Sequence, residues 1–374
     1  MRPTAWLLPF AFAAFGVMWG AWQAVLPDLA REHGLTSGPL GAILTVGFAV
    51  SLPSMLGTGR LVDRFGAGWG MAVPAAAMAL GLLLVGTLLP VPWLVAGVVL
   101  MAAGSGAFDV AINGAAMGDA EWSRPARLTL LHAAFSGGGM IGAVAAGLVI
   151  GTDVPSALVY PVLAAMLLLT AALAARSGWH ARPPEGGVPR AVALAMLPLA
   201  VLAGLAFLAE GSMETWSAIY LRDELGAAAF VGALGPAAFH AAMLIGRLIG
   251  AGVAGRLGAA STLLVAGLMA LVGMTAALLV PVPALAIPGM AVAALGASFV
   301  VPVVVSLAAD RAGGHAGRAA SYVLTLGYAG FLIGPSLVGV LGELAGLRVA
   351  LAVVPVAAAV IVLASRTRVA SRES

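Results

Sequence analysis

The 374-residue chain contains no cysteine and no lysine, and it has one asparagine and one glutamine. The absence of cysteine excludes disulfides, thiolate catalysis and cysteine-ligated metal or iron–sulfur sites. The absence of lysine excludes a Walker-type lysine and a Schiff base. No HExxH or GxSxG string occurs, so zinc or serine hydrolysis has no support in the sequence. We therefore expect a protein that is not an enzyme and holds neither metal nor cofactor.

Charged residues are also scarce. They make up 9% of the chain, against about 25% in soluble domains, whereas 62% of residues are hydrophobic. So few charges cannot cover a water-facing surface, and the mean hydropathy of +1.08 is typical of a protein that crosses the membrane many times. The net charge of +3 comes from scattered arginines, which is no nucleic-acid footprint. The expected surroundings are a lipid bilayer, with no nucleic-acid partner.

Apolar runs of about 20 residues, the length that spans a bilayer, predict an all-α membrane protein with twelve transmembrane helices. Six fall in each half of the chain. The predicted spans are 5–30, 37–58, 70–89, 91–118, 126–151 and 155–176, followed by 192–221, 226–250, 260–280, 283–309, 318–343 and 345–365.

The distribution of arginine predicts the orientation, because cytoplasmic loops carry an excess of basic residues. With the N-terminus in the cytoplasm, 15 of the 18 arginines lie on the cytoplasmic side, including Arg247 at the predicted end of its span. Only Arg31, Arg222 and Arg348 lie on the opposite side. We therefore expect a multi-pass protein of the cell membrane, in bacteria the inner membrane, with both termini cytoplasmic.

One long polar segment divides the chain. The string SGWHARPPEGGVPR begins at residue 177 and predicts a flexible cytoplasmic linker over 177–191. The predicted domains are thus an N-terminal six-helix bundle at 1–176 and a C-terminal six-helix bundle with a short cytoplasmic tail at 192–374. A constant offset of 192 residues aligns the halves and matches Glu32 with Glu224 and Arg64 with Arg256. Such a duplication is typical of transporters that bind substrate between two repeats.

The loop after the second span carries a motif of its own, GTGRLVDRFG at residues 57–66. It resembles the cytoplasmic signature of the major facilitator superfamily, in which the charges help to close the cytoplasmic side. The resemblance implies a gate that includes Gly59, Arg60, Asp63, Arg64 and Gly66. The second copy, GAGVAGRLG at 250–258, keeps Arg256 but has glycine in place of the aspartate. An ordinary positive-inside hairpin is the alternative interpretation.

The fourth span contains GSGAFDVAIN, which ends at Asn113. Asp109 and Asn113 are four residues apart and therefore share one helix face. The string is similar to the fourth helix of the fucose permease-like branch of the superfamily, whose acidic residue there serves sugar binding and proton coupling. The branch usually has glutamate at this position and proline after the asparagine, whereas this chain has Asp109 and Gly114.

The seventh span contains EGSMETWSAIY, in which Glu210, Glu214 and Ser217 form a polar stripe. A similar string occurs in bacterial facilitators allied to the same branch. We expect Glu210 to take up and release protons and Glu214 to affect substrate affinity, with the reverse assignment left open. A position of Glu214 at the outer water boundary is the alternative.

Further candidates for substrate binding or coupling lie in other spans, and each also has a packing interpretation. The glycine pairs Gly138/Gly142 and Gly330/Gly334 predict either a sliding interface between the halves or static packing. The polar and aromatic candidates are Gln23, Trp19, Trp22, His132 and Trp216.

These observations predict a secondary transporter that works by alternating access and moves a small polar solute, such as a sugar. Protons are the expected coupling ion, because desolvation favours the protonated form of a carboxyl group. An exporter of amphipathic compounds is the alternative within the same class. A non-transporting receptor or scaffold, and an intramembrane enzyme that uses Ser105 or Ser136 with His132, are alternatives from other classes. We expect the protein to be monomeric.

Overall fold

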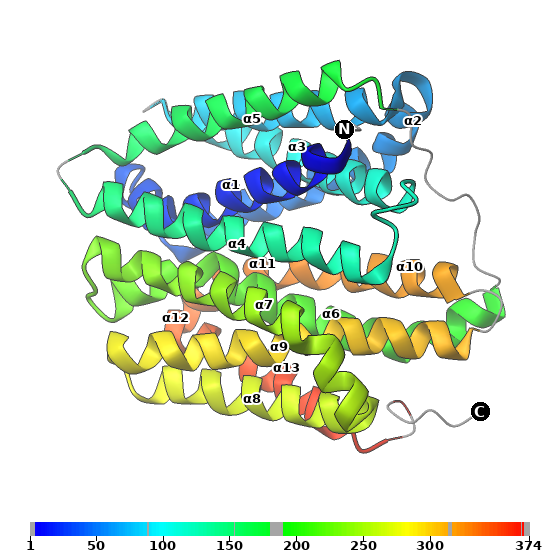
Figure 1. The fold of residues 1–374 in the computed structure, drawn as a ribbon. Coiled ribbons are helices and arrows are strands. Elements are labelled where there is room, and N and C mark those ends of the chain that lie inside the picture. Colours follow the sequence, from blue (N-terminus) through cyan, green and yellow to red (C-terminus); the bar gives the residue numbers. More distant parts are fainter. Residues whose placement is uncertain are drawn as a thin grey trace. The chain divides into compact units, whose positions relative to one another are not determined.

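The computed structural model describes residues 4–87, 90–152, 154–179, 190–312, 316–367 and 369. Within these ranges every regular element is a helix, as Figure 1 shows. Most of the predicted linker, residues 180–189, and the end of the predicted tail, 370–374, lie outside the described residues. The prediction that the regular elements are helices is confirmed for the described residues.

The described chain divides into two compact units, Met1–Pro184 and Glu185–Ser374. The first unit contains α1 (Thr4–Glu32), α2 (Ser37–Val85), α3 (Val91–Met117), α4 (Pro125–Ile150), the short 3-10 helix η1 (Ser156–Leu158) and α5 (Val159–Arg176). The second contains α6 (Arg190–Ile219), the π-helical turn η2 (Tyr220–Glu224), α7 (Ala229–Leu257), α8 (Ala259–Leu279), α9 (Pro283–Arg311), α10 (Ala316–Gly327), α11 (Ala329–Ala345), α12 (Leu347–Ala350) and α13 (Val353–Ala364).

Eleven helical segments in the described ranges are long and apolar enough to span a membrane, rather than the twelve expected. The difference arises at α2, which is 49 residues long and joins the spans predicted at 37–58 and 70–89. Gly66 interrupts its helical geometry with φ 85° and ψ 166°. Glycine adopts this positive φ without a steric penalty, so the chain can change direction there. About 20 residues cross a bilayer, and α2 is therefore long enough to cross it twice.

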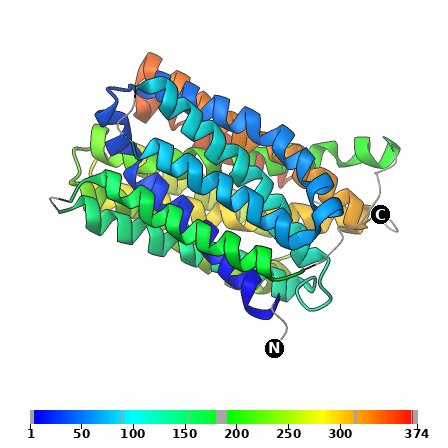
Figure 2. The same ribbon diagram turned by 90° about the horizontal axis from the view of Figure 1, so that it is seen from above.

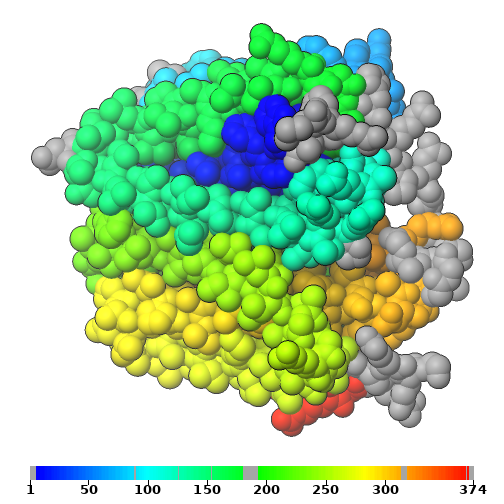
Figure 3. Space-filling model, in the orientation of Figure 1, coloured from blue at the N-terminus to red at the C-terminus, as the bar shows by residue number. Residues whose placement is uncertain are grey.

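In the first unit, α1 packs against α4 and α5, and α2 packs against α3 and α5. Figure 2 shows these helices as long rods that run in roughly one direction. Only a strip of α1 is visible between α4 and α5 in the space-filling view (Figure 3). In the second unit, α9 packs against α7 and α8, while α6 packs against α10 and α11. Apolar side chains fill the spaces between these helices.

Glycine allows the closest helix contacts, and these lie within the units. A Cβ atom at Gly138 or Gly142 of α4 would collide with the backbone carbonyl of Ala13 or Val17 of α1. In the second unit, Gly330 of α11 lies in the same way against α6. The glycine pairs therefore pack helices of one unit together, as the packing interpretation expected.

The 192-residue repeat is visible in the backbone. Gly34 and Gly226 have φ values of 62° and 64°, and Gly66 and Gly258 have 85° and 76°. Each pair is separated by the repeat offset, so the turns that end equivalent helices are the same in both halves. Side chains of different residue types surround these turns, yet the backbone conformation is kept.

Equivalent glutamates join the first and last parts of each unit. Glu32, at the end of α1, accepts a hydrogen bond from the Ser156 hydroxyl at 2.5 Å, just before α5. Glu224, its repeat equivalent, accepts one from the backbone N–H of Leu347 at 3.0 Å, where α12 begins. A carboxylate at a helix N-terminus is favourable because unpaired N–H groups point towards it.

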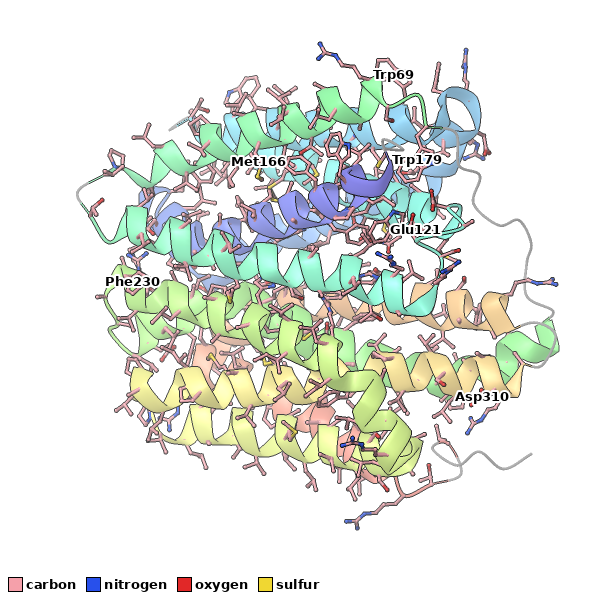
Figure 4. The ribbon with its side chains drawn as sticks, viewed as in Figure 1. Trp69, Glu121, Met166, Trp179, Phe230 and Asp310 are labelled. Carbon is pink, nitrogen blue, oxygen red and sulfur yellow. The ribbon has the colours of Figure 1, made fainter. Side chains whose placement is uncertain are left out.

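Labelled side chains mark one end of the first unit and both ends of the second (Figure 4). Figure 4 shows Trp69, Glu121 and Trp179 near one end of the first unit, where the Gly68 N–H donates to the Trp179 carbonyl at 3.1 Å. Phe230 and Asp310 lie at opposite ends of the second unit (Figure 4). The hydrogen bond from Gly68 to Trp179 joins α2 to the segment after α5 at the end of the first unit that carries the loop before α4.

We predict that Gly258→Ala destabilises the protein by about 1–3 kcal/mol, because alanine is strained at this positive φ with a ψ of 167°. No atom lies within 4 Å of a Cβ placed at Gly258, so the effect isolates backbone conformation. The matched control is Gly255→Ala in α7, where the helix is regular and the Cβ position is also open. It should be neutral or stabilising by up to about 1 kcal/mol. Thermal unfolding of the purified variants measures both, and equal midpoints would contradict the prediction.

Candidate functional site

The polar centre of the first unit is a pair of side chains on α3. The Asn113 side-chain amide donates to the Asp109 carboxylate at 3.0 Å and to the Asp109 backbone carbonyl at 2.9 Å. Both residues are partly buried in a helix long and apolar enough to span the membrane. The predicted sharing of one helix face is thus seen as a direct contact. The amide fixes the orientation of the carboxylate, so the pair presents a polar surface of defined geometry.

Aromatic rings from α1 to α4 form a cluster beside this region. The Trp19 ring stacks on Phe48 with centroids 6.4 Å apart and an interplanar angle of 11°. Phe15 makes edge contacts with Trp19 and with Phe108, the residue before Asp109. Trp19 is only partly buried. A flat, apolar face and a carboxylate–amide pair therefore belong to the same part of the first unit.

Of the other candidates in the first unit, Gln23 and Trp22 are buried, whereas His132 is partly buried. Gln23 and Trp22 are each 2% exposed, and Trp22 makes an edge contact with Tyr160 of α5. His132 of α4 makes an edge contact with Phe12 of α1 at 5.4 Å between centroids. Trp22 and His132 thus join α1 to α5 and α4 to α1.

The second unit places both glutamates of the seventh predicted span on α6. Glu210 is 5% exposed, and the Glu214 carboxylate is partly exposed. The Glu214 Oε1 atom lies 3.6 Å from Nε2 of His240 on α7, which is 1% exposed. Ser217 continues the same face and is fully buried. The stripe thus faces polar groups from α7 inside its own unit.

Arg247 belongs to this group, which the sequence did not predict. It interacts electrostatically with Glu210, Glu214 and Tyr328. Its span was expected to end at residue 250, which put Arg247 at the cytoplasmic boundary. The helix continues to Leu257, so Arg247 lies ten residues, or about 15 Å, before the helix end. A seven-residue spacing from His240, which returns to the same helix face, is the sequence signal that could have revealed it.

Trp216 lies between helices of the second unit. Its indole N–H donates to the backbone carbonyl of Pro335 on α11 at 3.1 Å, and its ring is fully buried. Phe207 of α6 stacks on Tyr328 at 5.1 Å between centroids. Both contacts hold α6 against the α10–α11 segment, and the hydrogen-bonding capacity of Trp216 is satisfied there.

The residues predicted to form the gate follow the course of α2. Arg60, Asp63 and Arg64 are exposed, and the Arg64 guanidinium lies 5.1 Å from the centre of the Phe65 ring. Gly66 ends this stretch with its positive φ, while Gly59 sits in regular helix. Arg256 occupies the last turn of α7, two residues before the equivalent Gly258. The charged residues therefore cluster at the two equivalent helix breaks.

The described geometry suits binding and charge movement. Asp109, Glu210 and Glu214 lie well inside helices that are long and apolar enough to span a membrane, and each has a polar neighbour in its own unit. Among the described residues no group of three or more histidine and acidic side chains could hold a metal ion.

Known membrane transporters resemble this chain in sequence and in fold. An uncharacterised major facilitator-type transporter of Yersinia pestis is 30% identical over 348 residues, which cover 91% of this chain and 89% of the relative. A solved bacterial homologue of the human lysosomal transporter Spinster, inward-facing and occupied, matches with a TM-score of 0.77 at 16% identity. That match covers 98% of this chain and 97% of the other.

The fucose:proton symporter of E. coli, solved as a variant with one substitution, shares the fold with a TM-score of 0.64 at 19% identity, over 98% of both chains. The family model of the Major Facilitator Superfamily matches residues 7–335. The chain therefore belongs to the major facilitator superfamily, whose members are membrane transporters and not enzymes.

Proposed function

We propose that the protein is a secondary active transporter that moves a small polar solute by alternating access, coupled to protons. The observation that carries this proposal is the burial of Glu210 together with the partly buried Asp109 and Glu214 in apolar spanning helices. An ionised carboxylate at mid-bilayer costs about 2.5–3.5 kcal/mol, so three would cost on the order of 8–10 kcal/mol. Such residues are expensive to keep, and in membrane proteins they mark substrate and proton pathways.

The proposed solute is polar and compact, such as a sugar. The Asp109–Asn113 pair offers acceptors and a polar face, and Trp19 offers a ring on which a sugar can stack. Two structural neighbours transport polar solutes according to their names, the fucose:proton symporter and the nucleoside transporter NupG, which matches with a TM-score of 0.73 at 13% identity. We assign Gln23, Trp22, His132, Trp216, Glu210 and Glu214 to the same substrate and coupling machinery.

An exporter of amphipathic compounds is the second candidate. It is favoured by the 15 methionines of a chain with few polar side chains, because flexible thioether side chains accommodate varied apolar surfaces. The two candidates differ in the ligand that should raise the thermal stability of the protein. A sugar or nucleoside should stabilise a transporter of polar solutes, whereas a hydrophobic cation or similar drug-like compound should stabilise an exporter of amphipathic compounds.

The proposed architecture has twelve spans, with α2 crossing twice because Gly66 divides it. Six spans belong to the bundle at 1–176 and six to the bundle at 192–374, with the linker at 177–191. We propose that the protein is a monomer in the bacterial inner membrane with cytoplasmic termini. Gly59, Arg60, Asp63, Arg64, Gly66 and Arg256 would form the cytoplasmic gate.

A thermal-shift screen followed by a flux assay tests the function. Purified protein is heated with sugars, nucleosides, organic acids or cationic drugs, and bound ligand raises the free energy of unfolding by RT ln(1 + [L]/Kd). Compounds that stabilise the protein are then tested for uptake into proteoliposomes under an imposed pH gradient. We expect a polar solute to accumulate. Flux of none of the stabilising compounds would support a receptor or scaffold instead.

We predict that Asp109→Asn abolishes accumulation driven by a pH gradient, because a side chain without a carboxyl group cannot exchange protons. Counterflow of labelled solute, which needs no net proton movement, should survive better. The matched control is Asp119→Asn, which changes a carboxylate in the loop after α3. Wild-type accumulation by Asp109→Asn would contradict the role of Asp109.

We predict that Asp63→Asn shifts the balance between inward-open and outward-open states by on the order of 1–3 kcal/mol, because it removes one charge from the proposed gate. Single cysteines on each side of the membrane can be labelled without interference, since the chain has none of its own. Labelling should rise on one side and fall on the other. Unchanged labelling on both sides would leave Asp63 only a role in topology.

A further inference from the structure

The second unit brings two acidic residues of α6 face to face with two basic residues of α7. The two helices are joined by a short connection at residues 220–228 and run in opposite directions. Gly235 of α7 lies against Ser217 of α6, and His240 lies 3.6 Å from Glu214. Moving along α7 from Gly235 to His240 thus corresponds to moving back along α6 from Ser217 to Glu214. Arg247, seven residues beyond His240, returns to the same face of α7, and Glu210 lies one turn further back along α6.

Electrostatic coupling follows the same register. Arg247 interacts electrostatically with Glu210, Glu214 and Tyr328, and its place two helical turns beyond His240 puts it on the same face of α7. Glu210 and Glu214 are themselves coupled, since they are one helical turn apart on one face. The guanidinium is therefore a counter-ion shared by both carboxylates.

The charges of the cluster do not cancel without a further proton. Two ionised carboxylates and one guanidinium leave one negative charge in a part of the protein where Glu210 and His240 are buried. A buried charge without compensation is strongly destabilising. We propose that Glu210, Glu214, His240 and Arg247 form a site for one proton, shared by the two carboxyl groups while Arg247 supplies a fixed positive charge. This inference rests on the proposed function and specifies how many protons the second unit carries.

His240 suits this role because its imidazole can donate to an ionised Glu214 or accept from a protonated one. The neighbouring guanidinium would repel a metal cation, and Ca²⁺ and Mg²⁺ need several oxygen ligands. The buried Ser217 hydroxyl, for which no hydrogen-bond partner lies among the described residues, extends the polar path one turn beyond Glu214. A proton is thus the cation that fits the group.

Other charged groups near α6 are at helix ends. On α9, α10 and α11, Asp310, Arg311, Arg318 and Glu343 lie in the first or last turns. Tyr328, between α10 and α11, is the additional titratable group coupled to Arg247. The proton balance of the site is therefore set by the four residues of the cluster.

Infrared spectroscopy of protonated carboxyl groups tests the inference directly. The full chain is reconstituted in lipid with Asp109→Asn as the background, and pH-difference spectra are recorded. We expect the signal of one carboxyl group. It should disappear in Glu210→Gln, because the remaining carboxylate is then balanced by Arg247. The signal of one carboxyl group should return in the double variant Glu210→Gln/Arg247→Gln, in which the Glu214 carboxylate has lost its counter-ion.

The control replaces an exposed arginine of the same helix. Glu210→Gln/Arg256→Gln should give no signal, since Arg256 lies in the last turn of α7. If a Glu210 variant does not fold, Glu214→Gln and Glu214→Gln/Arg247→Gln make the same comparison. A signal that persists in both single glutamine variants, or fails to return in both double variants, overturns the shared site. Because the spectra need no solute, this failure is distinct from failure of the transport assays.

Discussion

Charge balance within apolar helices is the constraint on which the rest of this structure depends. A carboxylate that leaves water must find a hydrogen bond, a counter-ion or a proton, since its burial otherwise costs several kcal/mol. Asp109 has the amide of Asn113, and the glutamates of α6 have His240 and Arg247. These partners lie in the same unit as the acid they serve. Each unit thus contains the partners that balance its own buried carboxylates.

Close helix packing provides the rigid frame for these polar groups. Glycines bring α4 against α1 and α11 against α6, and repeat-equivalent glutamates tie helix ends together. Side chains on such tightly packed helices keep fixed positions relative to one another, so Glu214 on α6 can face His240 on the neighbouring α7. The frame is duplicated at an offset of 192 residues, but the polar groups are not. The first unit has its acid–amide pair on α3, whereas the second has its acid–base cluster on α6 and α7, which are not the repeat equivalents of α3.

Much of the fold could be predicted because it depends on local properties. Apolar runs predicted the helices, and four-residue spacing placed Asp109 beside Asn113. The number of separate helices was harder, because the structure continues α2 through the loop around Asp63 and bends it only at Gly66. The interaction of Arg247 with the glutamates was not predicted, because its helix extends seven residues beyond the predicted end and places Arg247 well inside it. Contacts such as Trp216 with Pro335 depend on packing between helices far apart in sequence, which no local pattern encodes.

Membership of the major facilitator superfamily fits a chain that places carboxyl groups, which are costly to bury, inside its helices. The central claim is that solute and protons move together. It is tested most directly in proteoliposomes that contain a pH-sensitive dye, with a solute chosen by the thermal-shift screen. A solute gradient alone, with no imposed pH difference, should change the internal pH in the wild type. Solute flux with constant internal pH would contradict the account.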